Sequence, residues 1–199
     1  MSTHCPPPLP SPARVIVLNG ASSSGKTSLA KAMQATWAHP LHHVQLDSFR
    51  EMEPPGYWDD WKSKDSSTVA TMLSALCGAM HAAVREYSRH GQQVVLDTVL
   101  NDRRARQLLV EGLGDLPLFL IAVHCERAQL IEREAARGNR RNGLAENQIG
   151  KVHEEVPYDF EVDTTNAKPE QLAADIKHWL SGAPESKAIR QLCTLRHAA

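Results

Sequence analysis

The chain has 199 residues, of which 42% are hydrophobic and 23% are charged. This length fits a single domain with a substantial core and is too short for two comfortable domains. The formal net charge of -1 excludes a general attraction to nucleic acid or to a membrane surface, so recognition of any polyanion must be local. We therefore expect neither nucleic acid nor membrane as a partner.

The N-terminal residues and the cysteines bear on the compartment. Residues 1–13 are rich in proline and lack the apolar core of a signal peptide, so we expect a disordered lead. The longest apolar run, near LFLIAV, is too short to cross a bilayer. Cysteines stand far apart without C-x-x-C spacing, at Cys5, Cys77, Cys125 and Cys193. This spacing favours neither a zinc site nor a disulfide framework, and a soluble protein of the reducing cytoplasm fits best.

The first predicted strand and helix enclose a phosphate-binding motif. Val15 to Leu18 is an apolar run typical of a buried strand, and apolar residues recur at helical spacing from Thr27 to Met33. Between them, residues 20–27 match G-x-x-x-x-G-K-[ST] without a gap, in the strand–loop–helix context that this motif requires. The residues predicted to bind the nucleotide are Gly20, Ala21, Ser22, Ser23, Ser24, Gly25, Lys26, Thr27 and Ser28.

The residue types in this loop suit a triphosphate. Gly20 and Gly25 allow backbone angles that a Cβ would forbid, so that successive N–H groups can converge on phosphate oxygens. Lys26 adds a charge that can reach the β and γ phosphates, and the Thr27 hydroxyl is placed to ligate Mg²⁺. The alternative is a Gly/Ser-rich turn that only joins a strand to a helix.

Strand-like and helix-like periodicity then alternate along the chain. After the loop, we predict helices near 26–38 and 66–90, the second ended by Gly91, and further helices at 102–114 and 128–137. The strands between them are predicted near 42–47, at 93–100 and at 116–125. The segments 158–165 and 169–180 complete the series. Such alternation predicts an α/β fold, a three-layer P-loop NTPase sandwich with a parallel sheet of about five strands. Ligands are expected at the carboxyl ends of the strands.

The chain divides into three parts. We expect the lead to be followed by one P-loop domain over residues 14–182 and by a tail over residues 183–199. The tail is either a short helix or disordered. Pro184 and the mixed polarity of the segment do not distinguish these alternatives.

Two aspartates come at the ends of predicted strands. Asp47 ends the 42–47 strand and should project over the sheet edge beside the loop, where a carboxylate can orient an attacking hydroxyl and accept its proton. Asp97 closes the apolar run VVLD, as a carboxylate that holds Mg²⁺ directly or through water does. Each could instead cap the following segment. A regulatory GTPase is disfavoured, because the nearest approach to N-K-x-D, at 166–170, lacks the spacing and the aspartate.

An arginine-rich segment resembles a lid. Residues 132–143 carry Arg133, Arg137, Arg140 and Arg141 beside two glycines that break the helix. Arginines at such hinges can close over a triphosphate, with Arg133 on the nucleotide and Arg137 and Arg140 on the charge of the transferred group. The alternative is a solvated charged face paired with nearby glutamates.

Side chains after Asp47 are the predicted acceptor site. These are Ser48, Tyr57, Trp58 and Trp61, since aromatic rings near a base often form the flat walls of a small-molecule pocket. The rings could equally cover the sheet edge.

Several other polar residues have no predicted catalytic role. His153, Tyr158 and Asp159 favour a structural role, holding the last helix to the final strand. The sequence identifies no partner for His42 or His43.

Taken together, several segments resemble the chloramphenicol phosphotransferase-like family of P-loop kinases, from about Arg14 to Leu180. They are LNGASSSGKTS, the pair Asp47-Ser48, EREAARGNRRNGLAENQ, the pair Val152-His153 and YDFEVDTT. The resemblance implies a nucleoside-monophosphate-kinase-like fold and transfer of the ATP γ-phosphate to a primary hydroxyl of chloramphenicol, with Asp47 as base. It implies that the nucleotide and metal roles fall to Lys26, Thr27, Asp97, Arg133, Arg137 and Arg140.

One segment departs from the family pattern. Residues 49–67 are short and Trp-rich and do not follow the acceptor region of the antibiotic kinase. From the phosphate-binding motif and the resemblance, we expect ATP and Mg²⁺ as cofactors and a small hydroxyl compound as acceptor. The alternatives are a nucleotide or nucleotide-sugar kinase and an NTP-binding regulatory protein.

Overall fold

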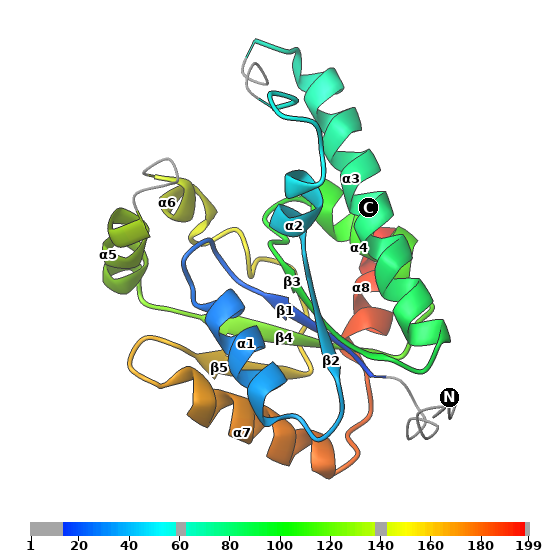
Figure 1. Cartoon of the computed structure of the whole chain (residues 1–199), viewed down its shortest axis with the longest axis vertical. Helices are drawn as coiled ribbons and strands as arrows, with labels where there is room; N and C mark the ends of the chain where they lie inside the picture. Colours follow the sequence, from blue (N-terminus) through cyan, green and yellow to red (C-terminus); the bar gives the residue numbers. More distant parts are fainter. Residues whose placement is uncertain (1–13, 59–62, 138–142, 198–199) are drawn as a thin grey trace, which may run out of the picture.

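The computed structural model describes residues 14–58, 63–137 and 143–197. Five strands form one parallel sheet in the order β2-β3-β1-β4-β5 (Figure 1). Their bounds are β1 Val15–Asn19, β2 Leu41–Gln45, β3 Gln93–Thr98, β4 Leu118–His124 and β5 Phe160–Asp163. The predicted α/β class and parallel five-stranded sheet are confirmed.

Among the described residues, five helices follow the predicted alternation, and further helices lie at residues 46–51, 144–148 and, in the tail, 188–197. They are α1 Lys26–Thr36, α2 Leu46–Glu51, α3 Ser66–Arg89, α4 Arg103–Leu113, α5 Arg127–Arg137, α6 Leu144–Gln148, α7 Pro169–Ser181 and α8 Ala188–His197. Aspartates cap the N-termini of α3 and α4, where the Asp65 side chain accepts a hydrogen bond from Thr68 N and the Asp102 side chain accepts one from Ala105 N. These caps satisfy N–H groups that a helix start leaves without partners.

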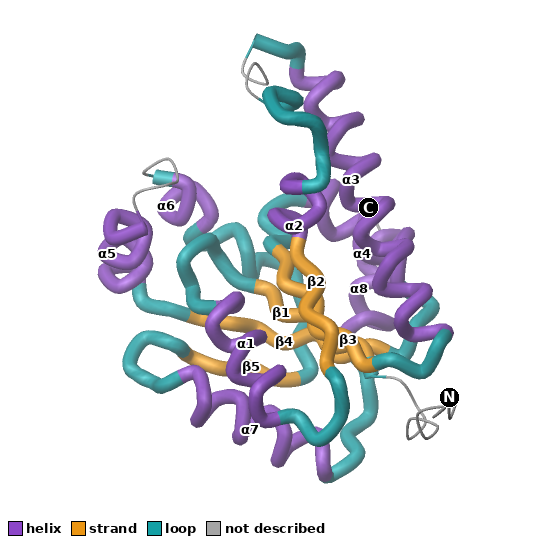
Figure 2. The backbone as a smooth tube through the Cα atoms, in the orientation of Figure 1, coloured by secondary structure: helices purple, strands orange, loops and turns teal. Residues whose placement is uncertain are grey.

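Helices cover both faces of the sheet (Figure 2). Because side chains alternate along a strand, Val15 and Val17 of β1 face a core formed with α3, α4 and α8, whereas Ile16 and Leu18 face one formed with α1 and α7. All four are fully buried. β1 is thus the central strand of three layers, as a parallel sheet covered on both faces requires.

The tail forms a helix that belongs to the core. Ala188, Ile189 and Leu192 of α8 are buried against the face that α3 and α4 cover. Asp159 anchors the start of this helix, because its Oδ1 accepts hydrogen bonds from the backbone N–H groups of Lys187 and Ala188. Its Oδ2 accepts another from Leu120 N in β4. Asp159 therefore ties the last helix to the sheet.

The long helix α3 projects beyond the body of the molecule (Figure 1). By length and composition alone it could cross a bilayer, with 22% of its most apolar window buried. One such helix is weak evidence for a membrane span, since core helices of soluble proteins share these properties.

Candidate active site

The loop after β1 has the backbone that a phosphate cradle needs. Gly25 has φ of +88°, and Ser23 has φ of 64°, a conformation that L-residues other than Asn and Asp seldom adopt. A Cβ at Gly20 would lie 2.4 Å from the carbonyl oxygen of Val123. The first motif glycine is therefore required by close approach to β4, and the second by its left-handed backbone.

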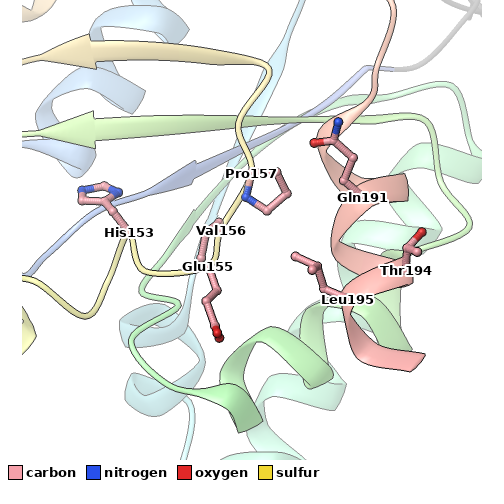
Figure 3. A pocket seen from close by; sticks show the side chains of 7 residues that line it. All are labelled: His153, Glu155, Val156, Pro157, Gln191, Thr194 and Leu195. Atoms are coloured by element: carbon pink, nitrogen blue, oxygen red, sulfur yellow. The ribbon is translucent and has the colours of Figure 1, made fainter. Parts of the chain in front are cut away.

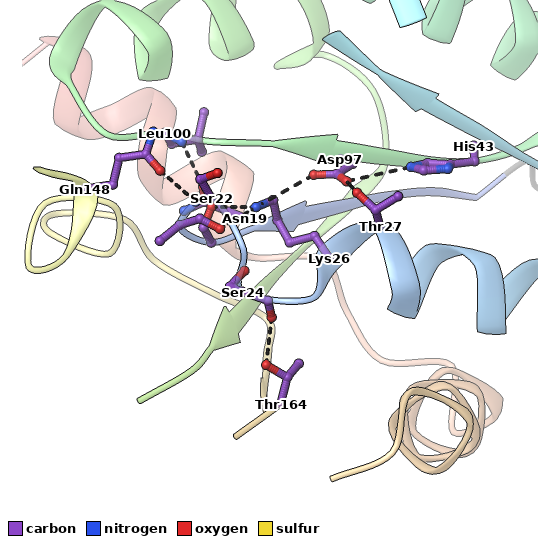
Figure 4. Close-up of polar contacts among 12 residues, drawn as sticks. Asn19, Ser22, Ser24, Lys26, Thr27, His43, Asp97, Leu100, Gln148 and Thr164 are labelled. Atoms are coloured by element: carbon purple, nitrogen blue, oxygen red, sulfur yellow. Dashed lines mark hydrogen bonds and ion pairs between the residues drawn. The ribbon is translucent and has the colours of Figure 1, made fainter. Parts of the chain in front are cut away.

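Lys26 is buried beneath this loop. Its Nζ donates hydrogen bonds to the carbonyl oxygens of Gly20 at 2.8 Å and Ala21 at 2.7 Å, and lies 3.9 Å from Asp97 Oδ1 (Figure 4). The ammonium thus lies inside the curve of the loop, where its charge faces the space that the loop surrounds.

Asp97 comes together with Thr27 at the carboxyl end of β3. The Thr27 hydroxyl donates to Asp97 Oδ2 at 2.8 Å, and the Asp97 side chain is 9% exposed. Burial alone would raise the pKa of Asp97, but His43, Lys26 and Thr27 together outweigh it and hold the pKa below its usual value. Asp97 is therefore an ionised carboxylate beside a hydroxyl, which are oxygen ligands that suit Mg²⁺.

A cleft of about 580 Å³ connects this phosphate side with the predicted acceptor side. Its polar wall includes Lys26, Thr27, Asp97, Asp47 and Arg50. Its opposite wall is largely apolar and comes from α3 and its neighbours, with Val69, Leu73, Cys77, Met80 and Leu108. A cavity of this size and lining suits a small organic ligand.

Asp47 does not end a strand, contrary to the expectation. β2 stops at Gln45, and Asp47 lies in the first turn of α2. The turn forms because Leu46 and Phe49, three residues apart, both pack against the core below. The carboxylate nevertheless lines the cleft.

The predicted acceptor residues differ in their position. Trp58 lines the cleft, with the Arg50 guanidinium 4.4 Å from its ring centroid and its Nε1 donating to Glu53. Tyr57 is 45% exposed and, like Ser48, is not part of the cleft lining. The Ser48 hydroxyl instead accepts a hydrogen bond from Gln45. Trp61 lies outside the described residues.

Of the predicted lid arginines, Arg133 is the one whose contacts the structure describes. Arg133 donates hydrogen bonds to the backbone oxygens of Thr164 at 2.7 Å and Thr165 at 3.3 Å. The Thr164 hydroxyl in turn donates to the carbonyl oxygen of Ser24 in the loop, at 2.6 Å. Arg133 thus lies one residue removed from the cradle and supports it from the β5 side.

The remaining lid arginines lie at or beyond the edge of the described segment. Arg137 is the last residue of α5. Arg140 and Arg141 lie outside the described residues.

Two buried side chains hold the loop and its surroundings: Gln148, which the sequence analysis did not single out, and Glu134, one of the glutamates expected only as partners of arginines on a solvated face. Gln148 of α6 accepts a hydrogen bond from Ser22 N of the loop at 2.6 Å. Glu134 of α5 accepts from Gly143 N and Ala145 N, both at 2.8 Å, and so fixes the start of α6. In the sequence these two polar residues look like surface residues of a charged segment. Only the packing of α5 and α6 shows that they are buried.

Asn19 is a third buried residue of this kind. It is fully buried at the end of β1, and its Nδ2 donates to the Tyr158 hydroxyl at 2.6 Å and to Val152 O at 2.7 Å. Its Oδ1 accepts from Leu100 N at 2.8 Å. His153, whose ring Nδ1 lies 2.7 Å from the same hydroxyl, joins this network. The expected role in holding the last helix falls to Asp159, whereas Tyr158, with His153 beside it, contacts the end of β1.

Burial changes the acidity of this pair. It raises the pKa of Tyr158 and, with the neighbouring His124, lowers the pKa of His153 to about 4. A second hollow of about 550 Å³ lies between residues 153–157 and α8 (Figure 3). Of the predicted catalytic and nucleotide-binding residues that the structure describes, none lines it.

The sheet and its cradle define the fold of a P-loop kinase, and solved structures agree. Shikimate kinase from Acinetobacter baumannii in complex with shikimate aligns with a TM-score of 0.61 at 12% identity, over 86% of this chain and 94% of that one. The Mycobacterium tuberculosis APS kinase CysC, in complex with AMPPNP and APS, aligns with a TM-score of 0.60 at 13% identity, over 86% and 99%.

Sequence comparison specifies the family. The model for "Chloramphenicol phosphotransferase-like protein" matches residues 13–181. A protein of Mycobacterium tuberculosis strains CDC 1551 and H37Rv, called "Putative O-phosphotransferase", is 31% identical over 199 residues, covering 90% of this chain and 87% of its own. The chain therefore belongs to the chloramphenicol phosphotransferase-like family.

Proposed function

We propose that this protein is an ATP- and Mg²⁺-dependent O-phosphotransferase that moves the γ-phosphate to a hydroxyl group of a small molecule. The observation that carries this proposal is the single cleft that Lys26, Thr27, Asp97 and Asp47 share. Donor and acceptor must meet in one water-restricted space for transfer, and this cleft offers phosphate-binding groups and a separate carboxylate.

Each group has a role that follows from its position. The loop amides and Lys26 hold the phosphates, and Asp47 orients the acceptor hydroxyl and takes its proton. Thr27 and Asp97 supply the oxygen ligands for Mg²⁺, which when bound neutralises charge on the phosphates. The ionised state of Asp97 and the adjoining hydroxyl fit that cation.

The apolar wall supports an acceptor with a hydrophobic body. Val69, Leu73 and Met80 offer surface to an aliphatic or aromatic group, and the Trp58 ring closes one side. Contacts of this kind stabilise by removing apolar surface from water. They favour a compound such as chloramphenicol over a polyol.

The proposed site of action is the cytoplasm, and we propose neither nucleic acid nor membrane as a partner.

The experiment that tests this function is an acceptor screen read by mass spectrometry. The protein is incubated with ATP and Mg²⁺ and with hydroxyl compounds, including chloramphenicol, and in parallel with nucleoside monophosphates. We expect an ATP-dependent gain of one phosphoryl group on an uncharged alcohol. Phosphorylation of the monophosphates alone would indicate a nucleotide kinase, and ATP hydrolysis without any phosphorylated product would indicate an NTP-binding regulator.

A lysine pair provides the matched control. Lys26→Ala should abolish transfer and weaken ATP binding, because it deletes the charge buried under the loop. Lys31→Ala removes an exposed lysine from the same helix and should leave both unchanged. Near-normal turnover in Lys26→Ala would refute the assignment.

A further inference from the structure

His43 lies beside Asp97 on the same face of the sheet. In the parallel pairing of β2 with β3, Gln45 is the partner of Asp97 and His43 that of Val95. Because side chains two residues apart in a strand share a face, His43 projects to the same side as Asp97, the side that α1 covers. Figure 4 shows the imidazole pointing at the carboxylate.

The imidazole is buried with one nitrogen unsatisfied. The His43 side chain is 9% exposed, and among the described residues no group lies within hydrogen-bond distance of its Nε2. Asp97 Oδ2 is 3.8 Å away, roughly an ångström beyond a hydrogen bond. A buried polar atom without a partner is destabilising, so an apolar side chain would fill this position better if filling were its only role.

The neighbouring histidine shows the contrast. His42 points to the opposite face, where its ring stacks on Tyr87 at a centroid distance of 4.4 Å. Its Nε2 lies 3.0 Å from Gln92 Oε1. The polar atom of His42 is thus satisfied within the fold, whereas that of His43 faces the proposed cation site.

We propose that His43 is a positioning residue for Asp97. A shift of roughly an ångström from the observed 3.8 Å brings the His43 Nε2–H into a hydrogen bond with Asp97 Oδ2, the oxygen that also accepts from Thr27, and the two donors together fix the carboxylate. Oδ1, which faces Lys26 at 3.9 Å, then remains directed toward the phosphates and their cation. The inference rests on the proposed function, in which Asp97 is a ligand of Mg²⁺.

Such an outer partner fixes a ligand before the cation arrives. A carboxylate held in one rotamer loses less conformational freedom on binding, and partners of metal ligands typically contribute 10- to 100-fold in metal affinity. His43 should therefore act on the Mg²⁺-dependent part of ATP binding and not on the binding of ATP itself, which depends on the loop and Lys26.

Calorimetric titration of the full chain with AMPPNP, with and without Mg²⁺, tests this inference. We expect Mg²⁺ to strengthen binding to the wild type, and His43→Phe, which keeps a ring and removes both nitrogens, to reduce this enhancement by roughly tenfold or more. His43→Gln, which restores an N–H donor, should recover most of it. His42→Phe is the control and should leave the enhancement unchanged.

Two further measurements separate positioning from a merely structural role. The thermal midpoint of His43→Phe should stay close to that of the wild type, since a ring still fills the buried position. His43→Leu replaces it if the larger ring does not fold. In an Asp97→Asn background, His43→Phe should cause no additional loss, because its effect passes through the carboxylate.

The outcomes distinguish this inference from the proposed function. Full Mg²⁺ enhancement in His43→Phe or His43→Leu overturns the role of His43 and leaves the kinase assignment intact. An equal loss of enhancement from His43→Phe in the wild-type and the Asp97→Asn backgrounds also overturns the role of His43 and leaves the kinase assignment intact. A wild type that binds AMPPNP with no effect of Mg²⁺ overturns both.

Discussion

The carboxylate of Asp47 lies in the first turn of α2, on the proposed acceptor side of the cleft that Lys26 and Thr27 also line. Phosphoryl transfer passes through a loose transition state that needs the acceptor oxygen in line more than it needs a strong base. A carboxylate on a helical turn anchored by Leu46 and Phe49 is held in place by the core beneath it. A substitution at Asp47 should therefore keep this position and change only the charge and proton affinity of the side chain.

Asp47→Asn keeps the shape of this side chain and removes its charge and proton affinity. We expect transfer to fall by about 10² to 10⁴ while ATP affinity stays close to that of the wild type, because the nucleotide is held by the loop. Single-turnover transfer beside ATP titration measures both. Glu51→Gln, at the exposed end of the same helix, is the control, and equal rates for Asp47→Asn and the wild type would assign the base elsewhere.

At the scale of elements, α3 and α4 approach closely where a glycine faces a histidine. A Cβ added at Gly112 of α4 would lie 2.6 Å from His81 Nδ1 and 2.8 Å from its Cβ and Cγ. The last two atoms are close to the backbone of α3 and cannot swing away. This contact sets the spacing of two helices whose residues line the cleft.

A matched pair of glycines tests this contact. Gly112→Ala should destabilise the protein by about 1 to 3 kcal/mol, because the methyl group forces the helices apart. Gly78→Ala, in α3, meets nothing within 4 Å and should stabilise by about 0.5 to 1 kcal/mol through helix propensity. Urea denaturation gives both values, and a stabilised Gly112→Ala would contradict the close packing.

Burial at the same contact makes stability depend on pH. It lowers the pKa of His81 from 6.5 to about 4. Above pH 6.5 the histidine is neutral in both states, and as the pH falls toward 4 only the unfolded chain takes up the proton. His81 should therefore cost stability on the order of 3 kcal/mol as the pH falls through this window.

Denaturation at several pH values measures this dependence. His81→Gln should flatten the slope of unfolding free energy between about pH 6.5 and 4, whereas His90→Gln, at the exposed end of α3, should not. An unchanged slope in His81→Gln would show that His81 takes up its proton over the same pH range in the folded and the unfolded protein.

At the scale of the whole molecule, the chain from β1 to α8 forms one folded unit. The family match ends at residue 181, yet α8 lies beyond it and completes the core on the α3 and α4 face. Leu192 is 4% exposed, whereas Leu195 on the same helix is 51% exposed.

These two leucines provide a test of that role. Leu192→Ala should destabilise by about 2 to 5 kcal/mol, because it leaves a cavity in the core, and Leu195→Ala should change stability by less than about 0.5 kcal/mol. Denaturation midpoints measure the difference. Equal, small effects would mean that α8 is not part of the folded core.

Much of the fold could be predicted from the sequence, because its signals are local. Apolar periodicity identified β1, β3 and β4 and the long helix α3, and the contiguous motif at residues 20–27 identified the cradle. Asp97 could be placed near Thr27 as well, since the carboxyl ends of neighbouring parallel strands lie at one edge. The boundary of β2 was wrong by two residues, because the packing of Leu46 and Phe49 starts a helix there.

Only the tertiary structure decided which polar side chains are buried together. His43 and Gln148 carry no local pattern that separates them from surface residues, yet strand pairing brings His43 beside Asp97 and helix packing brings Gln148 against the cradle. Asn19 likewise finds its partners only at distant residues such as Leu100. The sequence also left open whether the tail is a helix or disordered. Packing of Ala188, Ile189 and Leu192 against the core shows that it is a helix. Periodicity and motifs depend on neighbours along the chain, whereas burial and pairing depend on contacts between residues distant in sequence, and these exist only once the chain has folded.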